Sequence, residues 1–169
     1  MHESAMHAAQ KFAADYLDRN ATLQILDVGS MNVSPHRPDL SLRAVFDRWD
    51  YTGMDLAPGD NVDVVRKSGP FPFNRGTFDV AASANAFEHD QAFWRTFDEM
   101  VRVTKRDGLI LLIAPSRGDY HAHPKDYWRF MDDAPLALAD WNRRAELLEH
   151  YMQEGTTWRD CVAVFRIIG

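Results

Sequence analysis

Cysteine is almost absent from this chain of 169 residues, which contains only Cys161. A single cysteine excludes an internal disulfide and a cysteine-based zinc site. Long apolar runs are also missing, so no segment has the length of a membrane-spanning helix. The first residues show no basic and then apolar signal pattern. These absences favour a cytoplasmic protein that does not associate with a membrane.

The chain has no excess of positive charge. Its formal net charge is −6 and its isoelectric point is near 5.6. Binding to a long nucleic acid is therefore disfavoured, because phosphate contacts need clustered lysine and arginine. A hydrophobic content of 46% with 26% charged residues is typical of a globular protein. No linker, repeat or low-complexity tract divides the chain, so we predict a single domain over residues 1–169.

The central stretch of the sequence is 23–32, which begins as an apolar run and ends in a turn. The run is typical of a strand that is buried on both faces of a parallel sheet. Gly29 can adopt backbone angles that are closed to other residues, and a helix is predicted over 40–49. Strand, glycine turn and helix together form the unit that holds nucleotide-like ligands, and the amino end of the helix favours a ligand carboxylate. A glycine after a strand is also common in turns that bind nothing.

Further strands and helices are predicted along the rest of the chain. An acidic residue, Asp55, ends the second strand, where such a residue commonly hydrogen-bonds ribose hydroxyls. Residues 146–152 allow either a helix or a strand by pattern alone. Residues 155–160 are predicted to form a hairpin turn, so that the last strand runs antiparallel to the others. The predicted strands after the first are 51–55, 62–65, 78–83, 108–115 and 161–168, and the predicted helices besides 40–49 are 6–17, 90–103 and 132–142.

The order of these motifs resembles the class I S-adenosylmethionine-dependent methyltransferases. The first motif of that family is similar to residues 26–30, and its second-strand motif to 51–56. The motif around its fourth strand is similar to 78–89, and the helix and turn before its fifth strand to 100–108. A bacterial branch associated with surface-polysaccharide or sugar genes carries a histidine, a proline and an Asp-x-Trp-Arg-Phe segment after strand five. Residues 120–130 are similar to that segment.

The resemblance implies a fold and a cofactor. The expected fold is an α/β, Rossmann-like, seven-stranded and mostly parallel sheet with helices on both faces and an antiparallel last strand. Residues 146–152 are then the sixth strand. The expected cofactor is S-adenosyl-L-methionine.

The resemblance also places the cofactor. Asp27 and Gly29 would face its methionine part, Asp55 would accept hydrogen bonds from the ribose diol, and residues 83–85 would border the sulfur. Two departures from the family pattern stand out. Met31 replaces a second glycine, and 66–68 replaces an acidic residue near the adenine, which leaves the adenine partner unassigned. The full set of predicted cofactor-binding residues is Asp27, Gly29, Ser30, Asp55, Leu56, Ser83, Ala84, Asn85 and Glu88.

Candidate catalytic residues follow predicted strands four and five, whose carboxyl ends meet the cofactor. His121 or His123 is a candidate base, since imidazole titrates near neutral pH, and Asp126 is a candidate to orient it. Arg129 is a candidate to hold an acidic group of the acceptor, and Trp128 to stack on a sugar face. A structural alternative is that Trp128 anchors the loop and that Asp126 and Arg129 form an ion pair. The predicted catalytic set is His89, His121, His123, Asp126 and Arg129.

A divalent metal site is the alternative chemistry for this region. The residue types of His89, Asp90, His121, His123 and Asp126 are suitable ligands. Their spacing matches no defined ligand motif, so no metal is predicted from the sequence.

The predicted function is methyl transfer from S-adenosylmethionine to a small-molecule acceptor. A sugar or sugar nucleotide is the candidate acceptor by family analogy, with methylation on oxygen favoured over nitrogen. The alternatives are a non-catalytic S-adenosylmethionine-binding protein of the same fold and a nicotinamide-dependent oxidoreductase. The missing second and third glycines of the first turn argue against the oxidoreductase. In so short a chain, a homodimer or a partner protein is a candidate to complete the acceptor pocket.

Overall fold

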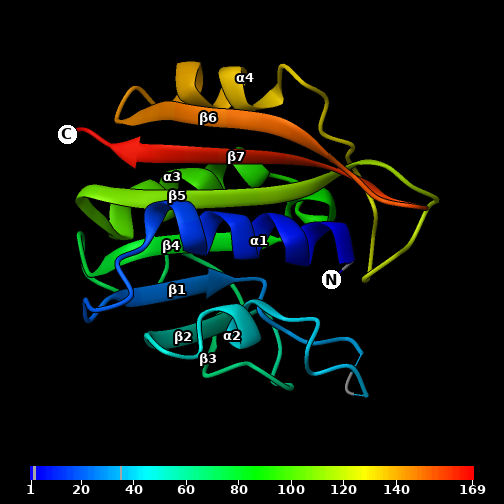
Figure 1. Cartoon of the computed structure of the whole chain (residues 1–169), viewed down its shortest axis with the longest axis horizontal. Helices are drawn as coiled ribbons and strands as arrows, with labels where there is room; N and C mark the ends of the chain where they lie inside the picture. The colour runs from blue at the N-terminus through cyan, green and yellow to red at the C-terminus, as the bar shows by residue number, and fades with distance from the viewer. Residues whose placement is uncertain (2, 35) are drawn as a thin grey trace.

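The computed structural model describes residues 1, 3–34 and 36–169 of the chain. These residues form one seven-stranded sheet with the order β3-β2-β1-β4-β5-β7-β6 (Figure 1). Among them, no helix is long and apolar enough to cross a membrane. The strands are β1 (Gln24–Val28), β2 (Asp50–Asp55), β3 (Val64–Val65), β4 (Phe78–Ala84), β5 (Thr104–Arg117), β6 (Ala145–Glu154) and β7 (Arg159–Ile167).

β1 is central, as its apolar sequence predicts. Ile25 pairs with Tyr51 of β2 on one side and with Val80 of β4 on the other, and both pairings are parallel. Ile25 and Leu26 are fully buried and belong to the hydrophobic cores on opposite faces of the sheet. The double burial explains why the strand has no alternating polar face.

β7 runs antiparallel to both of its neighbours, β5 and β6. The short connection 155–158 between β6 and β7 leaves room only for a hairpin, which reverses the chain. The remaining pairings in the sheet are parallel. The predicted mostly parallel sheet with an antiparallel last strand is therefore confirmed, and the ambiguous segment 146–152 is a strand.

Helices cover both faces of the sheet, as predicted. α1 (Glu3–Tyr16) and α2 (Leu42–Val45) pack on one face, around a core that contains Phe12 and Phe46. α3 (Phe93–Val103) and α4 (Ala134–Trp141) pack on the other face. Figure 1 shows α1 in front of the sheet, α3 behind it and α4 beside β6. A short 3-10 helix, η1 (Phe87–His89), follows β4.

The helix predicted over 40–49 is much shorter in the structure. Ser41 caps α2 by accepting a hydrogen bond from the backbone N–H of Ala44, and the helix ends at Val45. The chain then turns, which buries both Phe46 and Trp49 and lets the Trp49 indole donate to the Asp18 carbonyl. Tertiary burial of these rings outweighs helix propensity here. A helix of one turn has little dipole, so the predicted attraction of its amino end for a carboxylate is weak.

Two other predicted boundaries also move. The Asp90 side chain accepts hydrogen bonds from the Ala92 backbone and the Thr96 hydroxyl, so α3 begins at Phe93 rather than at Asp90. β5 begins at Thr104, directly after α3, and the predicted turn at 107–108 is an irregularity inside that strand, with Asp107 at a φ of 61°.

Removal of a core ring should measure how much the packing of α3 stabilises the sheet. Phe97 is fully buried, and its ring meets Phe165 of β7 with 5.0 Å between centroids. Phe97→Ala leaves a cavity, so we expect the free energy of unfolding in a urea titration to fall by about 3–5 kcal/mol. Leu136→Ala, at an exposed position on α4, should change it by less than about 0.5 kcal/mol. Equal losses in the two variants would contradict this account.

Candidate functional site: the carboxyl edge of the sheet

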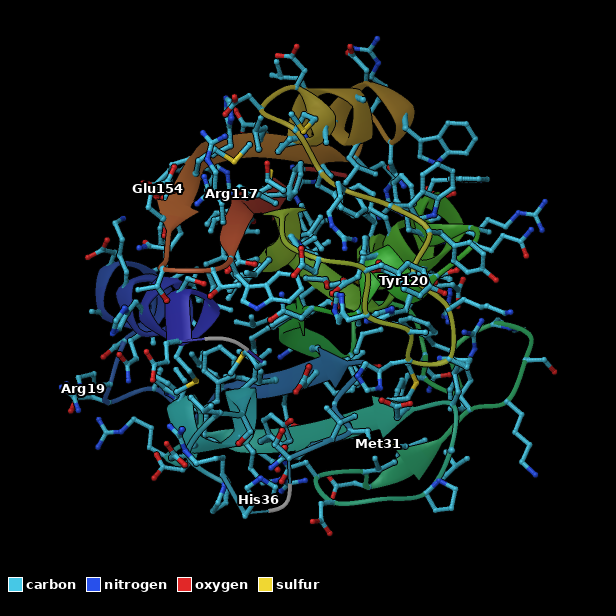
Figure 2. The ribbon with its side chains drawn as sticks, turned by 90° about the vertical axis from the view of Figure 1, so that its right-hand side faces the viewer. Arg19, Met31, His36, Arg117, Tyr120 and Glu154 are labelled. Carbon is cyan, nitrogen blue, oxygen red and sulfur yellow. The ribbon has the colours of Figure 1, made fainter. Side chains whose placement is uncertain are left out.

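Four segments meet at one edge of the sheet, because β1, β2, β4 and β5 are parallel and their carboxyl ends lie together. They are the turn 29–31 after β1, Asp55 at the tip of β2, the segment 85–89 after β4, and the loop 118–131 after β5. Figure 2 shows this edge toward the viewer, with Met31 and Tyr120 labelled on it.

Gly29 makes the turn after β1. Its φ is +83°, and a Cβ built on it would lie 2.3 Å from the Cβ of Ala86. Its backbone N–H donates to the Met54 carbonyl at 2.9 Å. The position therefore requires glycine both for its backbone angle and for the close approach of the segment after β4.

Asp55 holds this turn in place. One carboxylate oxygen accepts a hydrogen bond from the Met31 backbone N–H at 2.9 Å, and the other accepts one from the Leu56 N–H at 2.6 Å. A carboxylate oxygen has two lone pairs, so each oxygen keeps one for a further donor such as a ribose hydroxyl. Leu56 itself is exposed beside it.

Met31 fits the turn because its side chain packs sideways. Its Cγ would lie 3.1 Å from a Cβ built on Gly59, so it rests against the loop that follows β2. The adjacent Ser30 is buried, and its hydroxyl donates to the Asn61 carbonyl at 3.1 Å in the same loop. The Met31 side chain, which stands where the family has a second glycine, thus packs against the 57–61 loop.

Asp27 is buried inside β1, two residues before Gly29. Its Oδ2 accepts a hydrogen bond from the Tyr51 hydroxyl at 2.5 Å. Burial raises the pKa of Asp27 to about 7, and the Tyr51 hydrogen bond opposes this rise. The carboxyl group thus sits inside the first motif, where it titrates near neutral pH.

Ser83, which is expected to border the cofactor sulfur, is fully buried inside β4. Its hydroxyl donates to the Val28 carbonyl at 2.8 Å. Ser83 thus fastens β4 to β1 and has no surface for a ligand. Ala84 ends the strand, and Asn85 is the first residue past it, with a φ of 52°.

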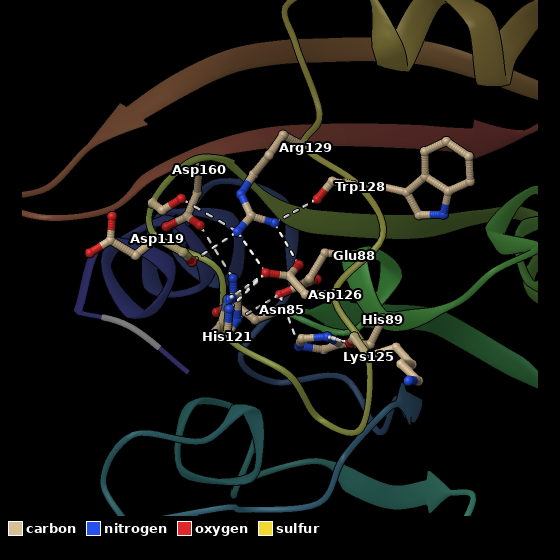
Figure 3. Close-up of polar contacts among 11 residues, drawn as sticks. Asn85, Glu88, His89, Asp119, His121, Lys125, Asp126, Trp128, Arg129 and Asp160 are labelled. Carbon is tan, nitrogen blue, oxygen red and sulfur yellow. Dashed lines mark hydrogen bonds and ion pairs between the residues drawn. The ribbon is translucent and has the colours of Figure 1, made fainter.

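The loop 118–131 folds back over η1. The backbone N–H groups of Tyr127 and Trp128 both donate to the Glu88 carbonyl, at 2.7 and 3.3 Å. The Trp128 indole donates to the Asp90 carbonyl at 2.9 Å, and Nδ1 of His89 contacts the Lys125 carbonyl at 2.5 Å. Figure 3 shows Nδ1 of His89 close to Lys125, and the Trp128 indole pointing away from Glu88 and His121. Trp128 therefore anchors the loop, and part of its ring stays exposed.

Arg129 is paired with Asp126 in the structure, and its role toward an acidic acceptor group stays a prediction. Its two terminal nitrogens bind Asp126 in a bidentate pair at 2.6 and 2.8 Å. One of them also donates to the Asp119 carbonyl at 2.9 Å. Asp126 is buried, and Arg129 holds the pKa of that carboxyl well below its usual range. The structural ion pair is the arrangement that forms.

Glu88, His89 and His121 meet at the centre of this cluster. Nε2 of His89 lies 3.6 Å from Oε1 of Glu88, and Nε2 of His121 lies 3.7 Å from the same oxygen. Nδ1 of His121 lies 3.2 Å from Oδ2 of Asp126. Glu88 is fully buried, which raises its pKa to about 8, and burial lowers the pKa of His89. His123 lies at the rim, with its ring centroid 5.8 Å from that of His89.

The sequence did not indicate Asp160, which closes the cluster from β7. It is fully buried and accepts hydrogen bonds from the Ser4 hydroxyl at 2.5 Å and from the Asn85 amide at 3.2 Å. The signal was weak, because Asp160 is one acidic residue at the start of an apolar strand. Only the sheet pairing of β7 with β5 brings it to the site.

Two open concavities of the described surface contain none of the predicted site residues. One lies at the amino edge of the sheet, between Leu23, Asp79 and Lys105. The other lies beside β3 and is lined by residues 65–68, Pro70 and Pro72. Ligands of open α/β sheets bind at the carboxyl edge, so the first concavity is not the cofactor site.

A model of the methyltransferase domain family matches residues 26–112, which is more than half of the chain. The chain belongs to this methyltransferase family. It is an S-adenosylmethionine-dependent methyltransferase, and its family is not that of the nicotinamide-dependent oxidoreductases. No curated protein matches the sequence significantly.

Solved structures share the fold of this methyltransferase at low sequence identity. The 1,6-didemethyltoxoflavin-N1-methyltransferase of Burkholderia thailandensis, solved with 1,6-didemethyltoxoflavin and S-adenosylhomocysteine, is 15% identical with a TM-score of 0.70, over 99% of this chain and 79% of that one. The geranyl diphosphate C-methyltransferase of Streptomyces coelicolor A3(2), solved with Mg²⁺, geranyl diphosphate and S-adenosyl-L-homocysteine, is 14% identical with a TM-score of 0.67, over 96% and 79%. The [4+2]-cyclase SpnF is 13% identical with a TM-score of 0.71, over 98% and 82%.

The residues at the carboxyl edge fit S-adenosylmethionine. The glycine turn allows close approach to β1, and the two lone pairs that Asp55 retains suit a diol. The cofactor supplies a methyl group that the positive sulfonium already activates. The protein must therefore hold the reacting atoms in line and exclude water.

Asp55→Ala should weaken cofactor binding. The change removes the predicted acceptor of the ribose hydroxyls and releases the Met31 N–H, so we expect the Kd for S-adenosylhomocysteine in calorimetric titration to rise by about tenfold or more. Asp140→Asn on α4, whose side chain is exposed, is the matched control and should leave the Kd unchanged. An unchanged Kd in Asp55→Ala would place the ribose elsewhere.

Asp27→Asn should change how stability depends on pH. The folded pKa of about 7 lies above the ordinary value of 3.8, so the folded state holds the proton more tightly between these values, and stability falls as the pH rises through that window. Asparagine does not titrate, so the Tm of the variant minus that of the wild type should increase from about pH 4 to about pH 7. Thermal melts across this range test the expectation, and a constant difference would refute it.

Proposed function

We propose that this methyltransferase transfers the methyl group to a hydroxyl oxygen of a small acceptor of the sugar or sugar-nucleotide class. The observation that carries the proposal is the Glu88, His89 and His121 cluster, which joins the segment after β4 to the loop after β5. A hydroxyl must lose its proton as it attacks the methyl carbon, whereas a neutral amine attacks with its own lone pair. A cluster built to handle a proton therefore favours an oxygen acceptor.

Both imidazoles are held in a defined orientation. A carbonyl oxygen can only accept, so Nδ1 of His89 carries the proton that faces Lys125 O, and Nε2 has a lone pair. Nδ1 of His121 faces Asp126 and its Nε2 likewise points to Glu88. This arrangement presents two Nε2 atoms, on a rigid support, to the place where the acceptor proton leaves.

The aromatic residues of the loop 118–131 support a sugar acceptor. Tyr120, Tyr127 and Trp128 are all exposed in part, and the indole N–H bond to Asp90 O fixes the plane of Trp128. An exposed, fixed aromatic face suits the apolar face of a sugar ring. The loop stands at the carboxyl edge in Figure 2, where Tyr120 is labelled.

On the donor side, we propose that Gly29, Ser30 and Asp27 lie along the methionine part of the cofactor. Asp55 and Leu56 take the ribose, and Ala84 and Asn85 border the sulfur. The support for this placement is the convergence of these residues at one sheet edge. Completion of the acceptor pocket by a second copy or a partner protein stays a prediction, as does a cytoplasmic location.

The second candidate is that this member of the methyltransferase family binds S-adenosylmethionine without transferring its methyl group. The structural similarity to the [4+2]-cyclase SpnF supports this candidate, because that protein shares the fold and is named for a reaction other than methyl transfer. The two candidates differ in one observable: only the enzyme forms a methylated product and S-adenosylhomocysteine.

His121→Ala tests the proposed acceptor side. With a panel of sugars and sugar nucleotides and mass detection of the product, we expect the methylation rate to fall by about 10²–10⁴-fold. The Kd for S-adenosylhomocysteine should stay within about twofold, since His121 is not among the proposed cofactor contacts. His150→Ala, at an exposed position on β6, is the matched control. Methylation of amines alone would overturn the oxygen acceptor, and no methylation of any acceptor would favour the binding protein.

A further inference from the structure

Three electron-pair donors converge at the centre of the site. Glu88, His89 and His121 each offer one ligand atom, and these three atoms all lie within 4.8 Å of one another. Among the described residues, neither carboxylate oxygen of Glu88 has a hydrogen-bond partner, although Glu88 is fully buried. A buried carboxylate without a partner is costly, so this geometry calls for a positively charged occupant.

The distances suit a cation better than a direct hydrogen bond. The two Nε2 atoms lie 3.6 and 3.7 Å from Oε1, beyond the usual hydrogen-bond range of about 2.7–3.2 Å. Two ligand atoms of a tetrahedral zinc site stand about 3.4 Å apart when each is about 2.1 Å from the metal. The two distances to Oε1 are therefore close to the spacing of two ligands on one zinc ion.

The Nδ1 atoms of both histidines make contacts of the kind seen in metal-binding histidines. Nδ1 of His89 contacts the Lys125 carbonyl, and Nδ1 of His121 faces the Asp126 carboxylate. Such contacts fix the ring and direct the Nε2 lone pair to the metal. Asp126 is fixed in turn by Arg129, so the orientation of His121 does not depend on the ion.

We propose that Glu88, His89 and His121 bind one divalent transition-metal ion of the zinc type, and that the acceptor hydroxyl completes its coordination. Two imidazoles and one carboxylate favour such ions over Mg²⁺ or Ca²⁺, which prefer oxygen ligands. The part that concerns the acceptor rests on the proposed function, while the ion site itself does not.

With the ion bound, both Nε2 lone pairs are coordinated, so neither imidazole is the base. The ion instead gives the hydroxyl a route to lose its proton. Coordination lowers the pKa of the bound hydroxyl, and its proton passes to water. The oxygen then forms the new bond to the methyl carbon as the bond from that carbon to sulfur breaks, and the sulfur keeps the electron pair. No redox step is involved.

This ligand set differs from the one that the sequence offered. Asp90 is occupied by the Ala92 N–H and the Thr96 hydroxyl, and Asp126 is occupied by Arg129. Glu88 was instead predicted to bind the cofactor. The structure brings Glu88 under the two histidines because the loop 118–131 folds over η1.

Metal titration of the chelator-treated full chain tests the site directly. We expect one equivalent of Zn²⁺ by calorimetry and, with Co²⁺ as a probe, the visible absorption of a low-symmetry nitrogen and oxygen site. Glu88→Gln and His89→Ala should each weaken Zn²⁺ binding by about tenfold or more. His150→Ala should leave it unchanged. Circular dichroism and thermal melts confirm that each variant is folded.

The outcomes separate this inference from the proposed function. No stoichiometric Zn²⁺ binding, or equal binding in the wild type and folded Glu88→Gln, would overturn the ion site. Methylation of a hydroxyl acceptor that persists in excess chelator would overturn coordination of the acceptor by the ion, while the proposed function stands. Stoichiometric Zn²⁺ binding that Glu88→Gln abolishes would support the ion site even if no hydroxyl acceptor is found.

Discussion

The ion pair between Asp126 and Arg129 is the interaction on which the acceptor side depends. Asp126 is almost fully buried, and its two oxygens bind both terminal nitrogens of Arg129 and the backbone N–H of His121. Loss of one partner would leave a buried charge, at a cost of about 3–5 kcal/mol. The pair closes the loop 118–131 on itself, and the loop can then place His121 over Glu88.

Polar contacts also hold the loops on the cofactor side, where some connections between strands have no helix. The described residues form no helix between β2 and β3 or between β3 and β4. Polar contacts hold these connections instead. Asp63 accepts from the Gly53 N–H and from Arg43, and Arg102 donates to the Phe71 and Phe73 carbonyls. A chain of this length can thus keep the sheet and its carboxyl edge with few covering elements.

Much of the fold was predictable because it is encoded by neighbours in sequence. The run 24–28 is apolar at every position but two, which marks a strand buried on both faces, and a glycine with positive φ must follow it. Boundaries were less predictable where distant packing decides them. α2 stops at Val45 because Phe46 and Trp49 enter the core, and the sequence window itself favours a longer helix.

The site shows the same division more sharply. By itself, the sequence determined which residue types stand at the carboxyl edge: the glycine turn, Asp55 at the tip of β2, and histidines after strands four and five. Only the tertiary structure decided their partners. Arg129 binds Asp126, and the Ser83 hydroxyl donates to the Val28 carbonyl. His89 and His121 both face Glu88. The reason is physical: backbone turns and burial follow from local residues, whereas a buried polar group takes whichever partner the folded chain brings within reach.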